Sequence, residues 1–325
     1  MIHRVLGLVC SVAFASACTA QSASAEQLIA DGHWKQARTI VERRFREAPK
    51  DAAAHFYLSQ IRNAFGDRSS PLPLAEQAVA LDGHVAKYHR QIAEVLGVMA
   101  QHSNMVQQLF LARRFRKEIG VALTLDPHDV QALRDLVEFY LLAPGIAGGD
   151  TRKAQATAER IVAVDRAEGF IANARISIFE KRNLDAETWL KKAAAIEPAS
   201  YRARIALAQF EVSPEHANLP AAEAAAQDAV RLDRGRADAY AILACIYARQ
   251  QRFEALDALL QEASRAVPDD LVAYFRAAEG LVAARRDFGR AASYIRKYLA
   301  QEPEGNEPSL ADARQLLDRI AQNGT

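Results

Sequence analysis

Small and aliphatic residues recur along the chain with the spacing of an α-helix. Five alanines illustrate the pattern: each lies 12 residues before a residue that ends a helical segment, and another small or aliphatic residue follows it after one helical turn. No segment of the sequence shows the alternation of apolar and polar residues that marks a strand. The pattern therefore predicts an all-α fold, with helices in close approach at Ala37, Ala154, Ala186, Ala222 and Ala291.

The residues that end these helical segments recur at nearly constant intervals. They are Pro49, Gly83, Pro127, Arg166, Pro198, Arg234, Pro268 and Pro303. Their successive separations are 34, 44, 39, 32, 36, 34 and 35 residues. A period near 34 is typical of a helix-turn-helix repeat, and the two longest separations indicate insertions.

Three sets of residues match a known repeat. Tyr240, Leu243, Ala244 and Tyr247 match the pattern aromatic-x2-Leu-small-x2-Tyr of a first helix. In another repeat, Ala186, Leu190, Ala193 and Pro198 match the pattern of a second helix. The segment Gly32–Ala37 matches the turn between two helices. At these positions the chain resembles the tetratricopeptide repeat family. The resemblance implies an α-solenoid of about seven to eight helix-turn-helix repeats over residues 26–303. A C-terminal capping helix and tail would follow over residues 304–325, with Pro308–Ala321 as the helix.

The first 25 residues have the features of a secretory signal peptide. A basic start precedes the apolar run Val5–Ala15, and small residues before Glu26 suit cleavage after Ala25. The run is shorter than the ~20 residues needed to cross a bilayer. We therefore expect a periplasmic or secreted protein. The alternative is a lipoprotein anchored at Cys18, although Ala15 stands where that signal usually has a larger aliphatic residue; membrane association is expected only in that case.

Charge and cysteine content narrow the functional classes. The chain has 41 Lys and Arg against 40 Asp and Glu, so no global attraction to nucleic acid is expected. Cys245 is the one cysteine left after cleavage and cannot form an internal disulfide. The basic clusters Arg43–Arg46 and Arg113–Arg116 indicate solvated helix faces, with contact to an anionic lipid or polymer as the alternative.

The sequence contains no motif of a known catalytic or metal site. It has neither a G-x-S-x-G nucleophile turn nor a GxGxxG loop. His84 and His89 are five residues apart, whereas the histidines of HExxH lie one helical turn apart. We therefore predict no catalytic, metal-binding or cofactor-binding residues.

The glycine-rich segment Leu142–Asp150 raises a separate question, because a glycine loop before a helix can bind phosphate. The repeat pattern instead makes it a lengthened turn between two helices, in which Gly148 and Gly149 supply positive φ and Asp150 or Thr151 caps the next helix. A P-loop would need Gly-Lys where Asp150 stands. A turn is the favoured interpretation, with anion binding as the alternative.

The second insertion, residues 96–115, is expected to extend both helices of its repeat. For both insertions, 96–115 and 142–150, two interpretations remain open: a binding feature or neutral drift.

In the resembling family, the first helix of each repeat lines a concave face that binds a peptide or a partner protein. Carried over to this chain, the fifth and ninth residues of each repeat give the candidate partner-binding residues Gln60, Arg90, Glu94, Arg134, Glu138, Arg175 and Gln209. They lack the Lys and Asn of the family's carboxylate clamp. Equally open is that Arg90 and Arg134 pair with Glu94 and Glu138 across neighbouring repeats.

The resemblance implies a non-enzymatic scaffold or adaptor of the bacterial cell envelope that binds an unidentified peptide or protein. Two alternatives are a lipid-anchored envelope assembly factor and, less favoured, an enzyme with its site in the insertions.

Overall fold

The computed structural model describes residues 23–305 and 307–323 of the chain, and every regular element within them is helical. The helices are α1 (Ala25–Ala30), α2 (Trp34–Glu47), α3 (Ala52–Ala64), α4 (Pro71–Leu81), α5 (Ala86–Gln101), α6 (Met105–Leu125), α7 (Val130–Leu142), the 3₁₀ turn η1 (Gly145–Ala147), α8 (Thr151–Val164), α9 (Arg166–Phe179), α10 (Asn183–Ala194), α11 (Tyr201–Val212), α12 (Leu219–Leu232), α13 (Ala237–Arg249), α14 (Phe253–Ala266), α15 (Val272–Ala283), α16 (Phe288–Leu299) and α17 (Leu310–Asn323).

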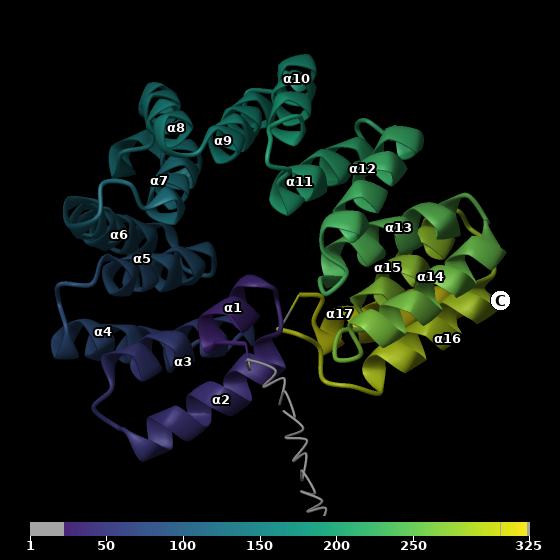
Figure 1. Cartoon of the computed structure of the whole chain (residues 1–325), viewed down its shortest axis with the longest axis horizontal. Coiled ribbons are helices and arrows are strands. Elements are labelled where there is room, and N and C mark those ends of the chain that lie inside the picture. The colour runs from purple at the N-terminus through teal and green to yellow at the C-terminus, as the bar shows by residue number, and fades with distance from the viewer. Residues whose placement is uncertain (1–22, 306, 324–325) are drawn as a thin grey trace, which may run out of the picture.

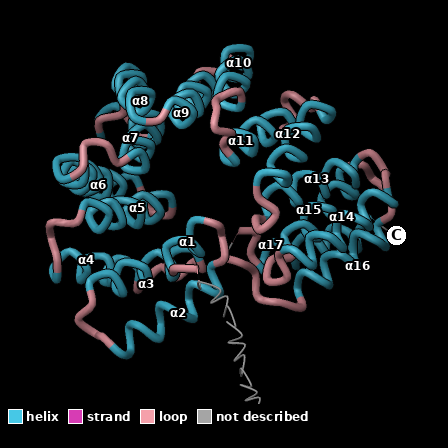
Figure 2. The backbone as a smooth tube through the Cα atoms, in the orientation of Figure 1, coloured by secondary structure: helices cyan, strands magenta, loops and turns pink. Residues whose placement is uncertain are grey.

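Successive helices pack as antiparallel pairs, and the pairs stack into a ring-shaped solenoid (Figure 1). The first helix of each pair also contacts the first helix of the next, from α1 through α3 and onward to α15, so these helices form the inner wall. The second helices, α2 to α16, lie outside them, with short loops between (Figure 2). After the shortened first pair, seven full pairs are present among the described residues, which confirms the predicted architecture.

The core follows the predicted spacing. The five alanines singled out by their position before a helix end are all 0% exposed. Because the alanine side chain is small, the helices can approach closely at these points, and larger apolar residues complete the core. The capping prediction is also confirmed: α17 packs against α16 and buries Ala313, Leu316 and Ile320.

Aspartate side chains fix where many helices begin. Their carboxylate oxygens accept hydrogen bonds from backbone N–H groups of the first helical turn, which have no partner inside the helix. The carboxylate also interacts favourably with the positive end of the helix dipole. The residues are Asp51, Asp129, Asp150, Asp165 and Asp287.

Polar contacts between the first and last repeats close the ring. Arg38 of α2 forms two hydrogen bonds, of 2.9 and 2.6 Å, to the carboxylate of Glu302. The ammonium of Lys35 donates to the carbonyls of Glu302 and Asp269, and its backbone N–H donates to Glu304 at 2.8 Å. Figure 1 shows the purple N-terminal helices beside the yellow C-terminal ones. We call this set of contacts the ring closure.

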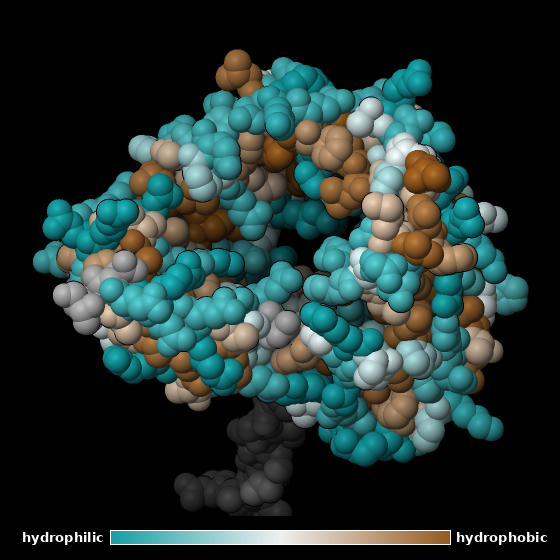
Figure 3. Space-filling view, turned by 180° about the vertical axis from the view of Figure 1, so that it is seen from behind, coloured by the Kyte–Doolittle hydropathy of each residue, from teal (hydrophilic) through white to brown (hydrophobic). Residues whose placement is uncertain are grey.

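The space-filling view shows that the ring is hollowed at its centre (Figure 3). Across residues 23–305 and 307–323, no helix has both the length and the apolar character required for a membrane span. The predicted signal peptide and Cys18 fall mainly outside the described residues. Ser24, just before the expected cleavage site, accepts the first hydrogen bond of α1.

Candidate functional site

Arginine and glutamate side chains connect neighbouring repeats along the inner wall. The guanidinium of Arg175 on α9 donates to both carboxylate oxygens of Glu138 on α7, at 2.7 and 2.9 Å. This bidentate geometry is the strongest form of the pair. Because both side chains are more than one third exposed, its effect on stability is modest. The pair is a charged surface feature of the concave face.

Arg90 on α5 is bound more deeply. Only 9% of its side chain is exposed, and its Nε lies 3.4 Å from Asp129 at the start of α7. A second, longer contact of 3.8 Å joins Arg90 to Glu94 on the same helix. Arg90 therefore holds two repeats together, and one guanidinium is shared between two carboxylates.

Arg134 continues this row into the next repeat. Its Nε lies 3.6 Å from Glu168 on α9, and Glu168 also pairs with Arg202 on α11 at 2.9 Å. Burial lowers the pKa of Arg134, and the nearby charge of Arg202 lowers it further. The sequence left open whether Arg90 and Arg134 pair between repeats. The structure shows that both do, although their inter-repeat partners are Asp129 and Glu168 instead of Glu138 and Glu94.

The remaining two candidate residues lie at opposite ends of the row of charged residues on α5, α7 and α9. Gln60 on α3 is half-buried and Gln209 on α11 is exposed. The structure thus places all seven candidates on inner helices, and it brings Arg90, Glu94, Glu138 and their partners together around α5 and α7. Whether these residues bind a partner stays a prediction.

The two insertions meet in one pocket. It has a volume of about 390 Å³ and lies between α5, α6 and the end of α7, and we call it the α5–α7 pocket. Residues 96–115 supply most of one side, as extended ends of α5 and α6, and the second insertion supplies Leu142, Ala143 and Pro144. The expectation that residues 96–115 extend both helices is confirmed.

Local contacts hold the pocket in shape. At the α5–α6 turn the amide of Gln108 donates to the carbonyls of Ala100 and Ser103, at 3.1 and 3.0 Å. In the apolar wall of the pocket, the rings of Phe115 and Phe139 stack with centroids 5.1 Å apart and an interplanar angle of 10°. A stacked pair of this kind contributes about 0.5–1.5 kcal/mol beyond its buried area. These contacts stabilise the apolar wall of the pocket.

The glycine-rich segment is the predicted turn. Gly148 has φ +106° and Asp150 caps α8, as expected. The expectation that Gly149 also has positive φ is wrong. Gly149 is needed for another reason: a Cβ there would lie 1.8 Å from the carbonyl oxygen of Ala143, so only glycine lets the chain pass. The backbone N–H of Asp150 donates to the backbone carbonyl of Tyr140 at 2.8 Å and closes the loop onto α7.

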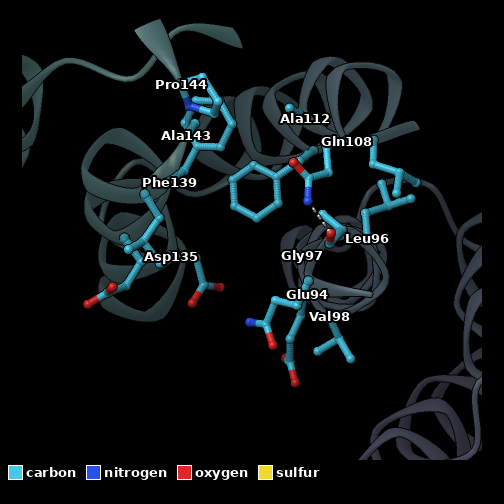
Figure 4. A pocket seen from close by; sticks show the side chains of 16 residues that line it. Glu94, Leu96, Gly97, Val98, Gln108, Ala112, Asp135, Phe139, Ala143 and Pro144 are labelled. Carbon is cyan, nitrogen blue, oxygen red and sulfur yellow. Dashed lines mark hydrogen bonds between the residues drawn. The ribbon is translucent and has the colours of Figure 1, made fainter. Parts of the chain in front are cut away.

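Carboxylates gather at one end of the pocket. Figure 4 shows Glu94 and Asp135 toward the lower end, and Gln108, Ala112, Ala143 and Pro144 at the other end. Glu138 also lines the pocket. Burial raises the pKa of Asp135 to about 7, and the charge of Glu94 adds to the rise. Burial also raises the pKa of Glu94, although 39% of its side chain is exposed, since it lies inside the ring with protein around it.

Large apolar side chains are exposed on the two segments that form the pocket. Met105, Val106 and Phe110 begin α6 and are 78%, 64% and 65% exposed, while Leu142 and Ile146 on the second insertion are 61% and 84% exposed. Figure 3 shows apolar patches on this side of the ring, at right in that view. Exposed apolar residues concentrated on one feature are typical of an interaction site.

The basic clusters, His89 and Cys245 show no sign of a second site. In the basic clusters, Arg44 pairs with Asp51 and Arg114 with Glu76, as expected for solvated helix faces. His89 contacts Glu118 at 2.8 Å. Burial raises the pKa of the Cys245 thiol, which is the unreactive direction. Within the described ranges, no group of three or more His, Cys, Asp and Glu is placed to hold a metal ion.

Asp135 is the site residue that sequence reasoning missed. It lies three residues before Glu138, so both carboxylates share a face of α7. That spacing was available in the sequence. Burial of Asp135 depends on α5 of the preceding repeat, which the spacing alone does not show.

Comparison with solved structures identifies the fold. The chain matches the tetratricopeptide repeat protein TTC0263 of Thermus thermophilus with a TM-score of 0.52 and 19% identity, covering 58% of this chain and 96% of that one. It matches yeast Tom70 with a TM-score of 0.59 and 14% identity, covering 91% of this chain and 59% of Tom70. No protein-family model and no curated protein sequence matches it. The chain has the fold of the tetratricopeptide repeat proteins, closed here into a ring.

Proposed function

We propose that the protein is a non-enzymatic scaffold of the cell envelope, which binds a peptide segment or partner protein on its concave face. The observation that carries the proposal is the meeting of the two insertions in the α5–α7 pocket, next to the charged row of the inner wall. Stacking of adjacent repeats brings the two insertions together, and there they enclose a pocket and expose large apolar side chains. This combination favours the binding interpretation of both insertions.

The pocket also bears on the enzyme alternative, which places a site in the same insertions. Its lining combines apolar side chains with Glu94, Asp135, Glu138, Gln101 and Gln108. No histidine, cysteine, serine or lysine is among the lining residues, so an acid-base or nucleophilic mechanism would rest on carboxylates alone. An apolar surface with a few polar groups suits recognition better.

The proposed location is the periplasm or the exterior of the cell, reached through cleavage of the signal peptide after Ala25. Support comes from the basic start, the apolar run and the small residues of the N-terminal 25 residues. Mass spectrometry of the mature N-terminus tests this directly. A terminus at Glu26 supports export, whereas a lipidated Cys18 supports the lipid-anchored alternative.

Crosslinking in cells, with captured proteins identified by mass spectrometry, tests the binding proposal. In one variant, Glu138→Arg combined with Arg175→Glu reverses the charges of the inner wall but preserves the ion pair. The control, Glu187→Lys with Lys191→Glu, does the same to a pair on outer helix α10. We expect the wild type and the control to capture the same partner, and the inner-wall variant to capture it no longer. Equal capture by all three would contradict binding at the concave face.

A further inference from the structure

The acidic end of the α5–α7 pocket has more negative charge than its arginines neutralise. Three arginines face it: Arg175 is engaged by both oxygens of Glu138, and Arg134 pairs with Glu168. Arg90 lies closer to Asp129 than to Glu94.

The charge of Asp135 is compensated only in part, by the charges of Arg90 and Arg134. Its Oδ2 is buried and has no hydrogen-bond partner. A buried carboxylate oxygen without a donor costs free energy, which a bound hydrogen-bond donor would recover. The charges that act on Asp135 are those of Glu94 and Arg90 from α5 and those of Arg134 and Asp129 from its own repeat. The pocket thus has an unfilled position for a positively charged donor.

Apart from Gln101 and Gln108, the rest of the pocket is apolar. Leu111 and Phe115 from α6 and Phe139 from α7 line it, and the exposed side chains of Phe110 and Leu142 lie on the segments that form it. Its volume of about 390 Å³ falls in the range of roughly 300–1,000 Å³ that ligand sites have. A ligand that fits both ends must have a cation and apolar groups a few atoms away.

We propose that the α5–α7 pocket binds a segment of the partner protein in which a Lys or Arg is flanked by apolar residues. The cation meets Asp135 and Glu94, and the apolar side chains lie against Phe115 and Phe139. Charge complementarity selects this occupant, because an acidic segment would bring a further negative charge to a carboxylate that is compensated only in part. This inference rests on the proposed function and names the chemistry of the partner.

Binding of the cation has a consequence for protons. In the free protein the pKa of Asp135 is about 7, so the group is largely protonated at pH 5 and largely ionised at pH 8. A cation favours the ionised form. Affinity for the basic segment therefore rises between pH 5 and pH 8, and binding below pH 7 releases a proton.

Fluorescence anisotropy with synthetic peptides tests the inference on the purified full chain. The peptide Ser-Gly-Leu-Lys-Leu-Phe-Gly-Ser carries fluorescein, and two companions replace Lys by Glu or the apolar residues by Ser. We expect the Lys peptide to bind at least about tenfold more tightly than either companion, a difference of about 1.4 kcal/mol. Equal binding of the Lys and Glu peptides would overturn the proposal.

Two variants distinguish an effect of filling the pocket from an effect on the fold. Gly97 lines the pocket, and a Cβ there would meet the Phe115 ring at 3.8 Å, so Gly97→Leu fills the pocket from the wall of α5. The control Gly120→Leu adds the same side chain to α6 where nothing lies within 4 Å. We expect Gly97→Leu to abolish binding of the Lys peptide and Gly120→Leu to leave it unchanged. Binding by both variants alike would place the peptide elsewhere.

Asp135→Asn supplies a readout that a structural role would not change. We expect about tenfold weaker binding of the Lys peptide at pH 8 and loss of the rise in affinity between pH 5 and pH 8. A pH dependence equal to that of the wild type would overturn the role of Asp135. A concentration-dependent dimer that excludes the peptide would show that a second copy is the occupant, also contrary to the proposal.

Failure of the basic-segment proposal can be distinguished from failure of the proposed scaffold function. If the Lys peptide does not bind but crosslinking still captures a partner at the concave face, the basic segment is wrong and the scaffold proposal stands. If crosslinking also captures nothing, both proposals fail.

Discussion

At the scale of single residues, Asp135 of the proposed binding site is expected to cost the folded protein stability. One carboxylate oxygen of Asp135 is buried and accepts no hydrogen bond. An asparagine at this position would avoid the cost of a buried charge. Residues with strongly shifted pKa values concentrate at functional sites, because surroundings that suit a ligand are seldom ideal for the empty protein.

Asp135→Asn is therefore expected to stabilise the protein above pH 7. The folded-state pKa of about 7 lies above the ordinary value of 3.8, so wild-type stability falls as the pH rises through this window. Asn does not ionise, and because Asp135 is only half-buried we expect a gain of about 1–2 kcal/mol at pH 8 and almost none at pH 4. Urea unfolding followed by circular dichroism measures this.

Asp185→Asn on α10 is the control, since 53% of its side chain is exposed. If Asp135→Asn raises the free energy of unfolding above that of the wild type equally at pH 8 and at pH 4, the carboxylate of Asp135 is solvated.

Gly149 tests the interpretation of the glycine-rich segment as a turn. Gly149→Ala forces a Cβ into the Ala143 carbonyl, so the loop must shift and the bond from Asp150 N–H to Tyr140 is strained. We expect a loss of about 1–3 kcal/mol in urea unfolding. Gly145→Ala, where a Cβ meets nothing within 4 Å, is expected to change stability by less than about 0.5 kcal/mol. Equal effects would show that the loop does not depend on this close approach.

At the scale of helices, small residues set how closely the repeats pack. Helix α12 has alanines on both its faces: Ala226 is 0% exposed, whereas Ala224 is exposed. Ala226→Leu should destabilise the protein by about 1–3 kcal/mol, because a larger side chain has no space there. Ala224→Leu should change stability by less than about 0.5 kcal/mol. Thermal unfolding of the two variants distinguishes them, and a reversed order would contradict the repeat register.

The helices are also the level at which sequence reasoning succeeds best. The spacing before Pro198 and Pro303 predicted that Ala186 and Ala291 would be buried, and both are. Local periodicity determines which face of a helix is apolar, so such predictions need no knowledge of distant residues. The extended α5 and α6 followed from the same counting. That the two insertions share a pocket did not, because it depends on the angle between successive repeats.

At the scale of the whole molecule, the ring was not predictable from the sequence. Lys35 and Glu302 are 267 residues apart, and their contact results from small rotations summed over every repeat. Neither residue differs from an ordinary surface charge in the sequence. The closure limits how a partner reaches the inner wall, which is accessible through the open faces of the ring or after the closure separates.

The ring closure is expected to be weak. Exposed ion pairs contribute about 0–1 kcal/mol each and are screened by salt. Lys35→Ala with Arg38→Ala removes the side-chain contacts of the ring closure and keeps the backbone bond from Lys35 to Glu304. Small-angle X-ray scattering should show a larger radius of gyration for this variant, with a similar increase for the wild type at high salt. The control Arg182→Ala with Lys191→Ala removes exposed pairs on α10 and should leave the radius unchanged. An unchanged radius in the first variant would mean that other contacts hold the ring.

Binding of a partner inside the ring can be tested by site-specific crosslinking from an inner and an outer helix. A photo-crosslinking amino acid replaces Gln209, exposed on inner helix α11, or Thr188, exposed on outer helix α10, and the protein is irradiated in cells. We expect one defined partner to be captured from position 209 and none from position 188. Capture of that partner from position 188 alone would contradict binding on the concave face.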